Sequence, residues 1–307
     1  MIYTLGKRIS VSLLMVILTA LLLSHPVFAH NFVQNSNAEL IAKIQEFKTE
    51  SNLIASNVSN STLAQWHVSK SQEYWSTNEI NGLSQKDPTL ANNLSTAIDD
   101  LYLLAGQQNT DPTVANQKAN VLNQMLDQAG SEEISSTDQN NATIQSLAIV
   151  GVLNEALKNY GEAVGSTVDL TNMSNMNMGS MSGMQSGNNM QGMSGMSSTP
   201  IVNVGAYQSA QALADTAQTM FNNLKTIAPS SSSPYLDKIG NALMDLKQAI
   251  NSKESGNDVM MIVHMQIHPN LISAFNIQAV PEFPMPLLLV VVSFIVIVFM
   301  SRVLPKM

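Results

Sequence analysis

Apolar residues recur at helical spacing along most of the chain, and this periodicity is the strongest constraint on the fold. Residues three, four and seven apart share one face of an α-helix, so each such run predicts a helix with a buried stripe. The clearest stripes are Leu40, Ile44, Phe47 and Ile54; Leu90, Leu94, Ala97, Leu101 and Leu104; and Ile144, Leu147, Leu153, Leu157 and Val164. The predicted helices lie near 37–56, 62–79, 88–107, 112–130, 138–164, 203–227, 235–252 and 257–268. No segment alternates convincingly with period two, so we expect an all-α protein.

Two helix starts are marked by an aspartate followed by a proline, Asp87-Pro88 and Asp111-Pro112. This order is typical of an N-cap and the first helical residue. The fold class indicated by these patterns is an antiparallel helical bundle with short connections, interrupted by one long loop at 169–201. The helices form either one bundle with an inserted loop or two lobes, 30–168 and 202–276.

The N-terminus has the features of a secretory signal. Lys7 and Arg8 precede an apolar run, Val11 to Leu23, and Val27-Phe28-Ala29 supplies small residues near a cleavage site. We expect a signal peptide over 1–29 and a mature chain that begins with His30. The alternative is an uncleaved anchor, although the apolar run is short for a membrane span of about 20 residues.

The C-terminus predicts a transmembrane anchor with a basic tail over 285–307. Phe283 to Leu304 is apolar apart from two serines and Arg302, and is long enough to cross a bilayer. Arg302 and Lys306 follow the span and favour a cytoplasmic tail. Residues 30–282 are therefore expected on the outer side of the membrane.

A Pro-rich neck over 277–284 precedes this anchor. Within it, Val280-Pro281-Glu282-Phe283-Pro284 resembles the PEF-type C-terminal sorting signal of archaeal surface proteins. The resemblance implies processing by a sortase-type enzyme, an archaeosortase, and a location at the extracellular face of the membrane or in a pseudoperiplasm. An ordinary membrane tail is the alternative.

The outer part of the chain is acidic and lacks cysteine. Removing Lys7, Arg8, Arg302 and Lys306 from the 14 basic residues leaves ten against 22 acidic ones, a formal charge of −12. Nucleic acid is therefore not an expected partner. Disulfides and thiolate metal sites are excluded because the chain has no cysteine. Sequons that fit a surface glycoprotein begin at Asn57, Asn60, Asn93, Asn141 and Asn172.

The loop contains an unusual run of methionines among Asn, Gly, Ser and Gln. They are Met173, Met176, Met178, Met181, Met184, Met190, Met193 and Met196. Neutral thioether sulfur suits Cu(I) and discriminates against Mg²⁺, Ca²⁺ and Zn²⁺. The run resembles the methionine-rich segments of exported copper-handling proteins, which implies copper as its ligand. The alternative is a low-complexity linker whose methionines scavenge oxidants.

Histidines offer a second set of candidate copper ligands, including Cu(II) ligands. Met261, His264, Met265 and His268 fall on one helical stripe, although Pro269 weakens that geometry because a residue before proline is pushed away from helix. His67 lies on an inward stripe or at a seam between lobes, where a lone histidine is usually a satisfied core residue. His30, if cleavage frees it, would provide an amine and an imidazole as in histidine-brace copper proteins.

Enzyme signatures such as HExxH, GxSxG and GxGxxG are absent, so we expect a protein that is not an enzyme. The sequence favours a membrane-anchored copper-binding protein that captures, buffers or passes copper to an accepting partner. One alternative is a structural or adhesive glycosylated spacer. Another is an iron-handling exported helical domain, which should show inward Glu and Glu-x-x-His motifs.

Overall fold

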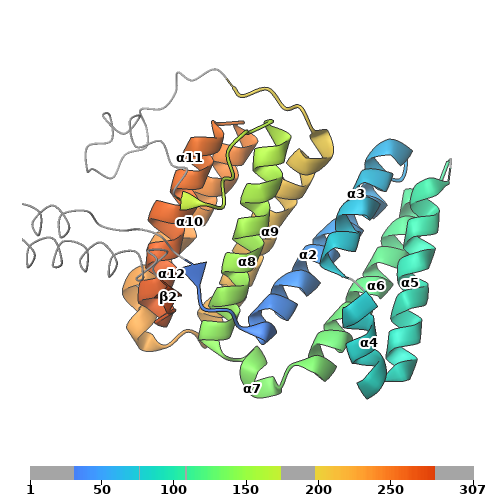
Figure 1. Cartoon of the computed structure of the whole chain (residues 1–307), viewed down its shortest axis with the longest axis horizontal. Coiled ribbons are helices and arrows are strands. Elements are labelled where there is room, and N and C mark those ends of the chain that lie inside the picture. Colours follow the sequence, from blue (N-terminus) through green and yellow to red (C-terminus); the bar gives the residue numbers. More distant parts are fainter. Residues whose placement is uncertain (1–30, 76, 108, 174–197, 281–307) are drawn as a thin grey trace, which may run out of the picture. The chain divides into compact units, whose positions relative to one another are not determined.

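A computed structural model describes residues 31–75, 77–107, 109–173 and 198–280, and helices dominate it (Figure 1). The elements are β1 (Asn31–Phe32), α2 (Ser36–Asn57), α3 (Ser61–Tyr74), α4 (Thr77–Lys86), α5 (Pro88–Gly106), α6 (Pro112–Glu133), α7 (Ser136–Gln139), α8 (Ala142–Ala163), α9 (Val204–Ile227), η3 (Ser230–Ser232), α10 (Ser233–Asn251), α11 (Gly256–Met261), η4 (Ile262–Ile267), α12 (His268–Phe275) and β2 (Ala279–Val280). The all-α prediction is confirmed, with β1 and β2 forming a minimal two-stranded sheet.

The helix starts agree with the predicted caps. The side chain of Asp87 accepts a hydrogen bond from the backbone N–H of Leu90, and that of Asp111 accepts one from Thr113. Asparagines perform the same role elsewhere, which explains part of the Asn-rich composition. The side chains of Asn35, Asn60, Asn141 and Asn203 cap α2, α3, α8 and α9.

The single helix predicted over 62–79 is wrong, because the structure divides it into α3 and α4. Trp75 has extended backbone angles, φ −127° and ψ 98°, and ends α3. Its side chain is buried, with its ring centroid 6.3 Å from that of Phe47 on α2. The gain from burying a large aromatic ring outweighs the local preference for continuing the helix.

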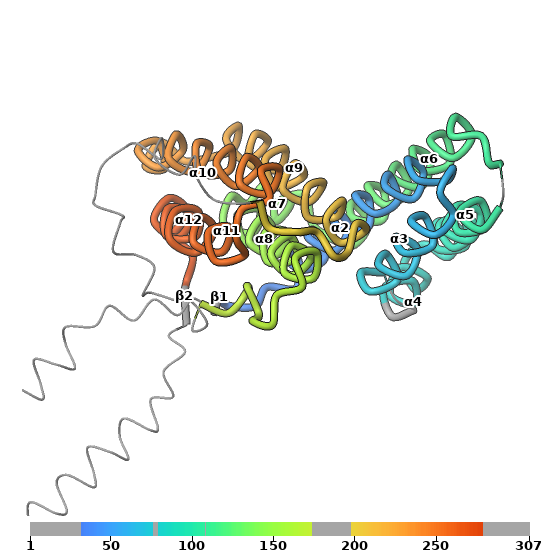
Figure 2. Tube along the Cα trace, turned by 90° about the horizontal axis from the view of Figure 1, so that it is seen from above, coloured from blue at the N-terminus to red at the C-terminus, as the bar shows by residue number. Residues whose placement is uncertain are grey.

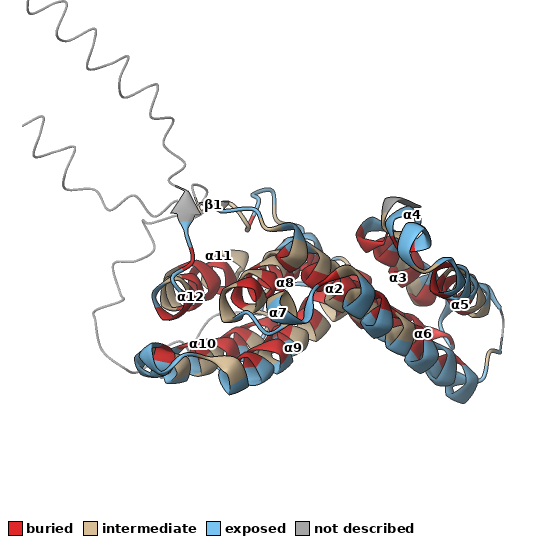
Figure 3. Ribbon diagram, turned by 90° about the horizontal axis from the view of Figure 1, so that it is seen from below, coloured by how far each residue is buried: buried red, intermediate tan, exposed pale blue. Residues whose placement is uncertain are grey.

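Two apolar clusters lie within one compact unit, Phe32–Gln278. The α8–α12 cluster is built mainly from α8, α9, α10, η4 and α12, and the α3–α6 cluster from α3, α5 and α6. Helix α2 contributes to both: Ile41 lies in the first cluster, whereas Phe47 and Ile54 lie in the second. Figure 2 shows α2 running between the two groups of helices, and Figure 3 shows buried residues following the inner faces of both.

The division between the clusters does not follow the methionine-rich segment. Helix α8 precedes that segment and α9 follows it, yet the two helices pack extensively against each other and share the α8–α12 cluster. Because α8 and α9 pack against each other, both flanks of the segment lie on the same group of helices.

Several predicted features lie outside the described residues. They are the signal peptide over 1–29, the methionine-rich segment from 174 to 197, and the anchor over 285–307. Among the helices that the structure does describe, none combines the length and apolar character that crossing a bilayer requires.

The close contact of α2 with α8 depends on Gly151. A Cβ at this position would lie 2.9 Å from the Cβ of Ala42, and neither group can move without moving a helix. Gly151→Ala should therefore destabilise the protein by about 1–3 kcal/mol, as overpacking does. Gly82→Ala on α4 is the matched control, since nothing lies within 4 Å of its added Cβ. The control should stabilise by up to about 1 kcal/mol through helix propensity. Equal effects in urea unfolding would contradict this account of the α2–α8 contact.

Candidate functional site

Both flanks of the methionine-rich segment are held close to the turn after α10. On the leading side, Leu170 is buried, and a Cβ at Gly256 would lie 3.1 Å from its Cδ1. On the returning side, the N–H of Thr199 donates to the carbonyl of Lys253 at 2.8 Å. The segment therefore leaves and re-enters the helical unit beside the start of α11. Of its eight methionines, the structure describes only Met173, which is half-buried.

The helix that begins at this turn contains a π-helical stretch, η4. The N–H of His268 donates to the carbonyl of Val263, five residues back, and His268 keeps helical angles. Proline at 269 lacks an N–H, and its ring would crowd the carbonyl four residues earlier, so a wider turn accommodates it. The predicted helix over 257–268 consequently continues through Pro269 to Phe275.

The π-helical stretch brings the two predicted histidines together. Their ring centroids are 5.1 Å apart in an edge-to-face arrangement, and both rings are buried. His268 makes a similar contact with the ring of Phe32 at 5.1 Å. His264 Nε2 lies 3.1 Å from the carbonyl of Leu170, so this nitrogen carries the proton and donates. His264 therefore joins the π-helical stretch to the leading flank of the methionine-rich segment.

The two methionines of this stripe differ in exposure. Met261 is buried, and its sulfur accepts a hydrogen bond from the Asn257 amide at 3.4 Å. Met265 is half-buried. Across the described part of the chain, no group of three or more His, Asp or Glu side chains is arranged to hold a metal ion. Any metal at this stripe would rely on two imidazoles and thioethers.

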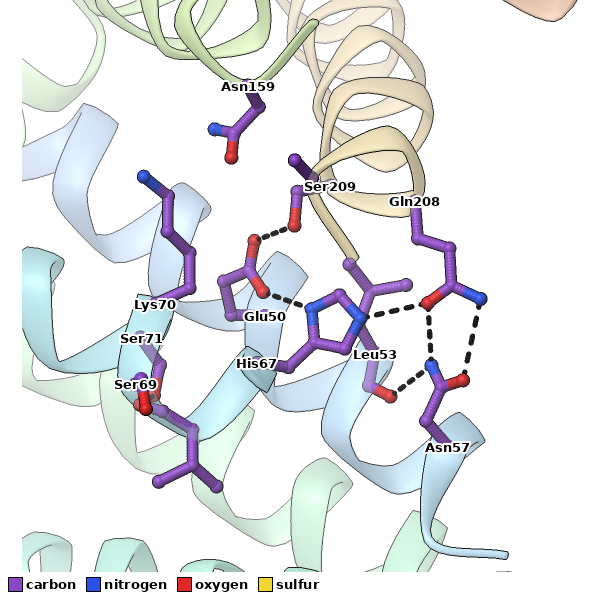
Figure 4. Close-up of polar contacts among 12 residues, drawn as sticks. Glu50, Leu53, Asn57, His67, Ser69, Lys70, Ser71, Asn159, Gln208 and Ser209 are labelled. Atoms are coloured by element: carbon purple, nitrogen blue, oxygen red, sulfur yellow. Dashed lines mark hydrogen bonds and ion pairs between the residues drawn. The ribbon is translucent and has the colours of Figure 1, made fainter. Parts of the chain in front are cut away.

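His67 is fully buried and lies at the centre of a different polar network (Figure 4). Its Nδ1 lies 2.7 Å from Oε2 of Glu50, and its Nε2 lies 2.9 Å from Oε1 of Gln208. Ser209 donates to the other oxygen of Glu50 at 2.6 Å. The network joins α2, α3 and α9, and it occupies both nitrogens of the ring. His67 therefore behaves as a satisfied core residue.

One backbone carbonyl determines which atoms of this network donate hydrogen bonds and which accept them. Asn57 Nδ2 lies 2.9 Å from the carbonyl of Leu53, which can only accept, so the amide nitrogen of Asn57 must face it. The same nitrogen donates to Gln208 Oε1 at 3.1 Å. That oxygen in turn faces His67 Nε2, which must donate. Nδ1 faces a carboxyl oxygen of Glu50, so a proton lies between these two atoms and both ring nitrogens are engaged.

An ion pair between a buried lysine and a half-buried glutamate lies one helical turn further along α3. Lys70 Nζ is 2.9 Å from Glu155 Oε1 on α8, and the same oxygen accepts from Tyr74 at 2.9 Å and from Asn159 at 3.0 Å. Burial alone would lower the pKa of Lys70, but the carboxylates of Glu155 and Glu73 outweigh it and raise that pKa. The Lys70–Glu155 pair joins α3 to α8.

Glu46 lies in the same region, and its surroundings strongly shift its pKa. Burial, reinforced by the Glu155 carboxylate, raises the pKa of Glu46 to about 8 despite nearby lysines. Burial and the same carboxylate also raise the pKa of Tyr74 above its usual range. The interior between α2, α3 and α8 therefore favours a neutral Glu46 at neutral pH.

Sequence reasoning singled out His67 but missed its partners. Glu50 lies three residues after Phe47 and four before Ile54, on the same apolar stripe, so the pattern did contain a signal for an inward carboxylate. Lys70 lies likewise between His67 and Tyr74. The contributions of Gln208 and Glu155 come from α9 and α8, and no local pattern links them to α3.

No protein family, curated protein or solved structure matches the chain. A function for the protein therefore has to be inferred from its residues and from the geometry of the site.

The His67–Glu50 pair allows a stability test. His67→Leu leaves the buried carboxyl group of Glu50 without its hydrogen-bond partner on α3 and should cost about 1–3 kcal/mol in urea unfolding. The double variant Glu50→Gln/His67→Leu replaces that carboxyl group by an amide that can still bond to Ser209. It should be more stable than the single variant. If adding Glu50→Gln lowers the free energy of unfolding further, loss of the Glu50–His67 contact does not explain the cost of His67→Leu.

Glu46 predicts a pH dependence with a definite sign. Its pKa is about 8 when folded against a usual value of 4.5, so the folded state holds more protons between these values. The free energy of unfolding should therefore fall as pH rises from about 4.5 to about 8. Glu46→Gln should remove this loss and exceed the parent above about pH 8 by on the order of a few kcal/mol. Glu39→Gln, an exposed position on the same helix, is the control and should follow the parent. If the free energy of unfolding depends on pH in the same way for Glu46→Gln and the parent, Glu46 is not the group responsible.

Proposed function

We propose that the chain is an exported, membrane-anchored, all-helical copper-binding protein of the cell surface, with Cu(I) bound by the methionines from Met173 to Met196. The methionine-rich sequence provides the ligands, since soft neutral thioethers select Cu(I) over harder divalent ions. One structural observation carries the proposal: the flanks of this segment are fastened beside the helix that holds His264, His268, Met261 and Met265.

The stripe of Met261, His264, Met265 and His268 is the proposed second site. Imidazole and thioether together suit copper, with imidazole extending the range to Cu(II). His264 supports a connection between the two sites, because its Nε2 bonds to Leu170, three residues before Met173. Copper captured by the segment would therefore arrive close to the stripe. His67 is left out of this site, because both its nitrogens are engaged.

His30 remains a further proposed ligand, conditional on cleavage after Ala29. It precedes Phe32, whose ring contacts His268, by two residues in the sequence. The signal peptide, the PEF-like neck and the C-terminal anchor are the proposed means by which the helical unit reaches the outer surface. A copper-accepting partner and a sortase-type processing enzyme complete the proposal.

A competition titration tests the principal ligands. The fragment 30–282 is titrated with Cu(I) against a chromogenic Cu(I) chelator, alongside a variant with leucine at all eight methionines of the segment. Leucine keeps apolar bulk and removes sulfur, so affinity should fall at least about tenfold while circular dichroism stays helical. Met244→Leu, at an exposed position on α10, is the control and should bind as the parent does.

The opposite outcome has a definite meaning. If the leucine variant holds Cu(I) as tightly as the parent, the segment is a linker and the helical unit is a spacer.

Binding of Cu(II) is scored separately in His264→Gln and His268→Gln. These variants should lose Cu(II) while the Cu(I) affinity of the segment is retained.

A further inference from the structure

The sequons of the chain differ in how far the folded structure exposes them. Four lie wholly within the described residues, beginning at Asn57, Asn60, Asn93 and Asn141, whereas the fifth includes Ser174, which lies outside them. In an exported protein, the asparagine of Asn-x-Ser/Thr accepts an oligosaccharide through its Nδ2 atom. The transferring enzyme has to bind the asparagine and the hydroxyl residue together, so all three residues must be within its reach.

The amide nitrogen of Asn57 is already fully used. It donates to the carbonyl of Leu53 at 2.9 Å and to Oε1 of Gln208 at 3.1 Å, which engages both of its hydrogens (Figure 4). The middle residue of this sequon, Val58, is buried. A sugar on Nδ2 would replace one hydrogen and remove one of these two hydrogen bonds, so the fold disfavours modification at Asn57.

At Asn93 and Asn141 the asparagine is exposed, but another residue of the sequon is held by packing. Leu94 follows Asn93 and is fully buried in the α3–α6 cluster. Thr143, the hydroxyl residue of the Asn141 sequon, donates to the carbonyl of Phe275 at 3.0 Å and so joins α8 to α12. Presenting either sequon to an enzyme would require these contacts to open.

The sequon at Asn60 meets no such obstacle. Asn60, Ser61 and Thr62 are all exposed, at the turn that joins α2 to α3. The Oδ1 atom of Asn60 caps α3 by accepting a hydrogen bond from the N–H of Leu63 at 3.3 Å. Among the described residues, the Nδ2 atom has no hydrogen-bond partner. A sugar on Nδ2 would leave the capping oxygen unaltered, so modification and capping are compatible.

We propose that Asn60 is the residue at which the folded protein carries an N-linked oligosaccharide. In the transfer, Nδ2 forms a bond to C1 of the first sugar, and the bond from C1 to the phosphate of a lipid-linked donor breaks. The lipid phosphate is the leaving group, and Nδ2 gives up one proton, so nothing is oxidised or reduced. This inference rests on the proposed export of the chain and is independent of copper.

The modified turn lies beside the start of α9. Trp66, one helical turn beyond Thr62, packs so closely on Gly205 that an added Cβ there would lie 2.5 Å from Trp66 Cδ2. Residues 198–203 lead from the methionine-rich segment into α9. A bulky, hydrated sugar on Asn60 would therefore extend from the end of the helical unit at which that segment returns.

Transfer in vitro tests this assignment. The full chain, free of sugar and solubilised in detergent, is incubated with an isolated oligosaccharyltransferase and its lipid-linked oligosaccharide. Mass spectrometry of proteolytic peptides then identifies the occupied asparagines, and synthetic peptides that carry each sequon serve as unfolded acceptors. All peptides should accept sugar. The folded chain should be modified at Asn60 at least about tenfold faster than at Asn57, Asn93 or Asn141, because those sites require local opening.

Substitutions within the sequon provide the controls. Asn60→Asp keeps a capping oxygen but removes the acceptor nitrogen, and Thr62→Val removes the hydroxyl group, so both should abolish transfer to this turn. Thr62→Ser is the matched control and should retain it. Circular dichroism of all three variants should match that of the parent, because each keeps an oxygen that caps α3.

Four results would overturn the proposal. They are the absence of sugar at Asn60 in the folded chain, a peptide carrying Asn60 that accepts none, equal rates at the four sequons, and transfer to this turn that survives Asn60→Asp or Thr62→Val. Export is decided separately, by the first residue of the chain produced with its own N-terminus. The acceptor site and the proposed export can therefore fail independently.

Discussion

Helix α2 has to bury one stripe in two apolar clusters at once, and the same stripe carries Glu46 and Glu50. Burying a carboxylate is costly unless it is paired or neutral. The fold uses both solutions, since His67 faces Glu50 and burial keeps the proton on Glu46. The positions of α3 and α9 around α2 reflect that requirement, because α3 supplies His67 and α9 supplies Ser209 as partners of Glu50.

The proposed copper function is located elsewhere. The α8–α12 cluster holds α8 against α9 and so brings together the two flanks of the methionine-rich segment, which are distant in sequence. His264 then ties the leading flank to the π-helical stretch through Leu170. The packed helices thus hold the two described flanks of the segment beside the same turn. Binding residues often lie on segments that a packed scaffold positions.

Helical periodicity was a reliable guide wherever one stripe was apolar and one cap was strong. Asp87 and Asp111 marked helix starts because capping depends on residues within one turn. The break at Trp75 could not be read from the sequence, because it depends on a ring contact with Phe47, 28 positions away. The π-helical stretch was missed for a related reason. Pro269 signalled an ending, yet the packing of His268 and Leu271 keeps the helix intact across it.

The sequence by itself determined the helices, their caps, the absence of disulfides and the concentration of thioethers in one segment, because these depend on composition and on neighbours within a few residues. It also placed His67 on an inward stripe. Only the tertiary structure decided that His67 meets Glu50 and Gln208, that Lys70 meets Glu155, and that both flanks of the methionine-rich segment lie beside α11. These contacts join residues up to 141 positions apart, and such pairings arise from the packing of whole helices.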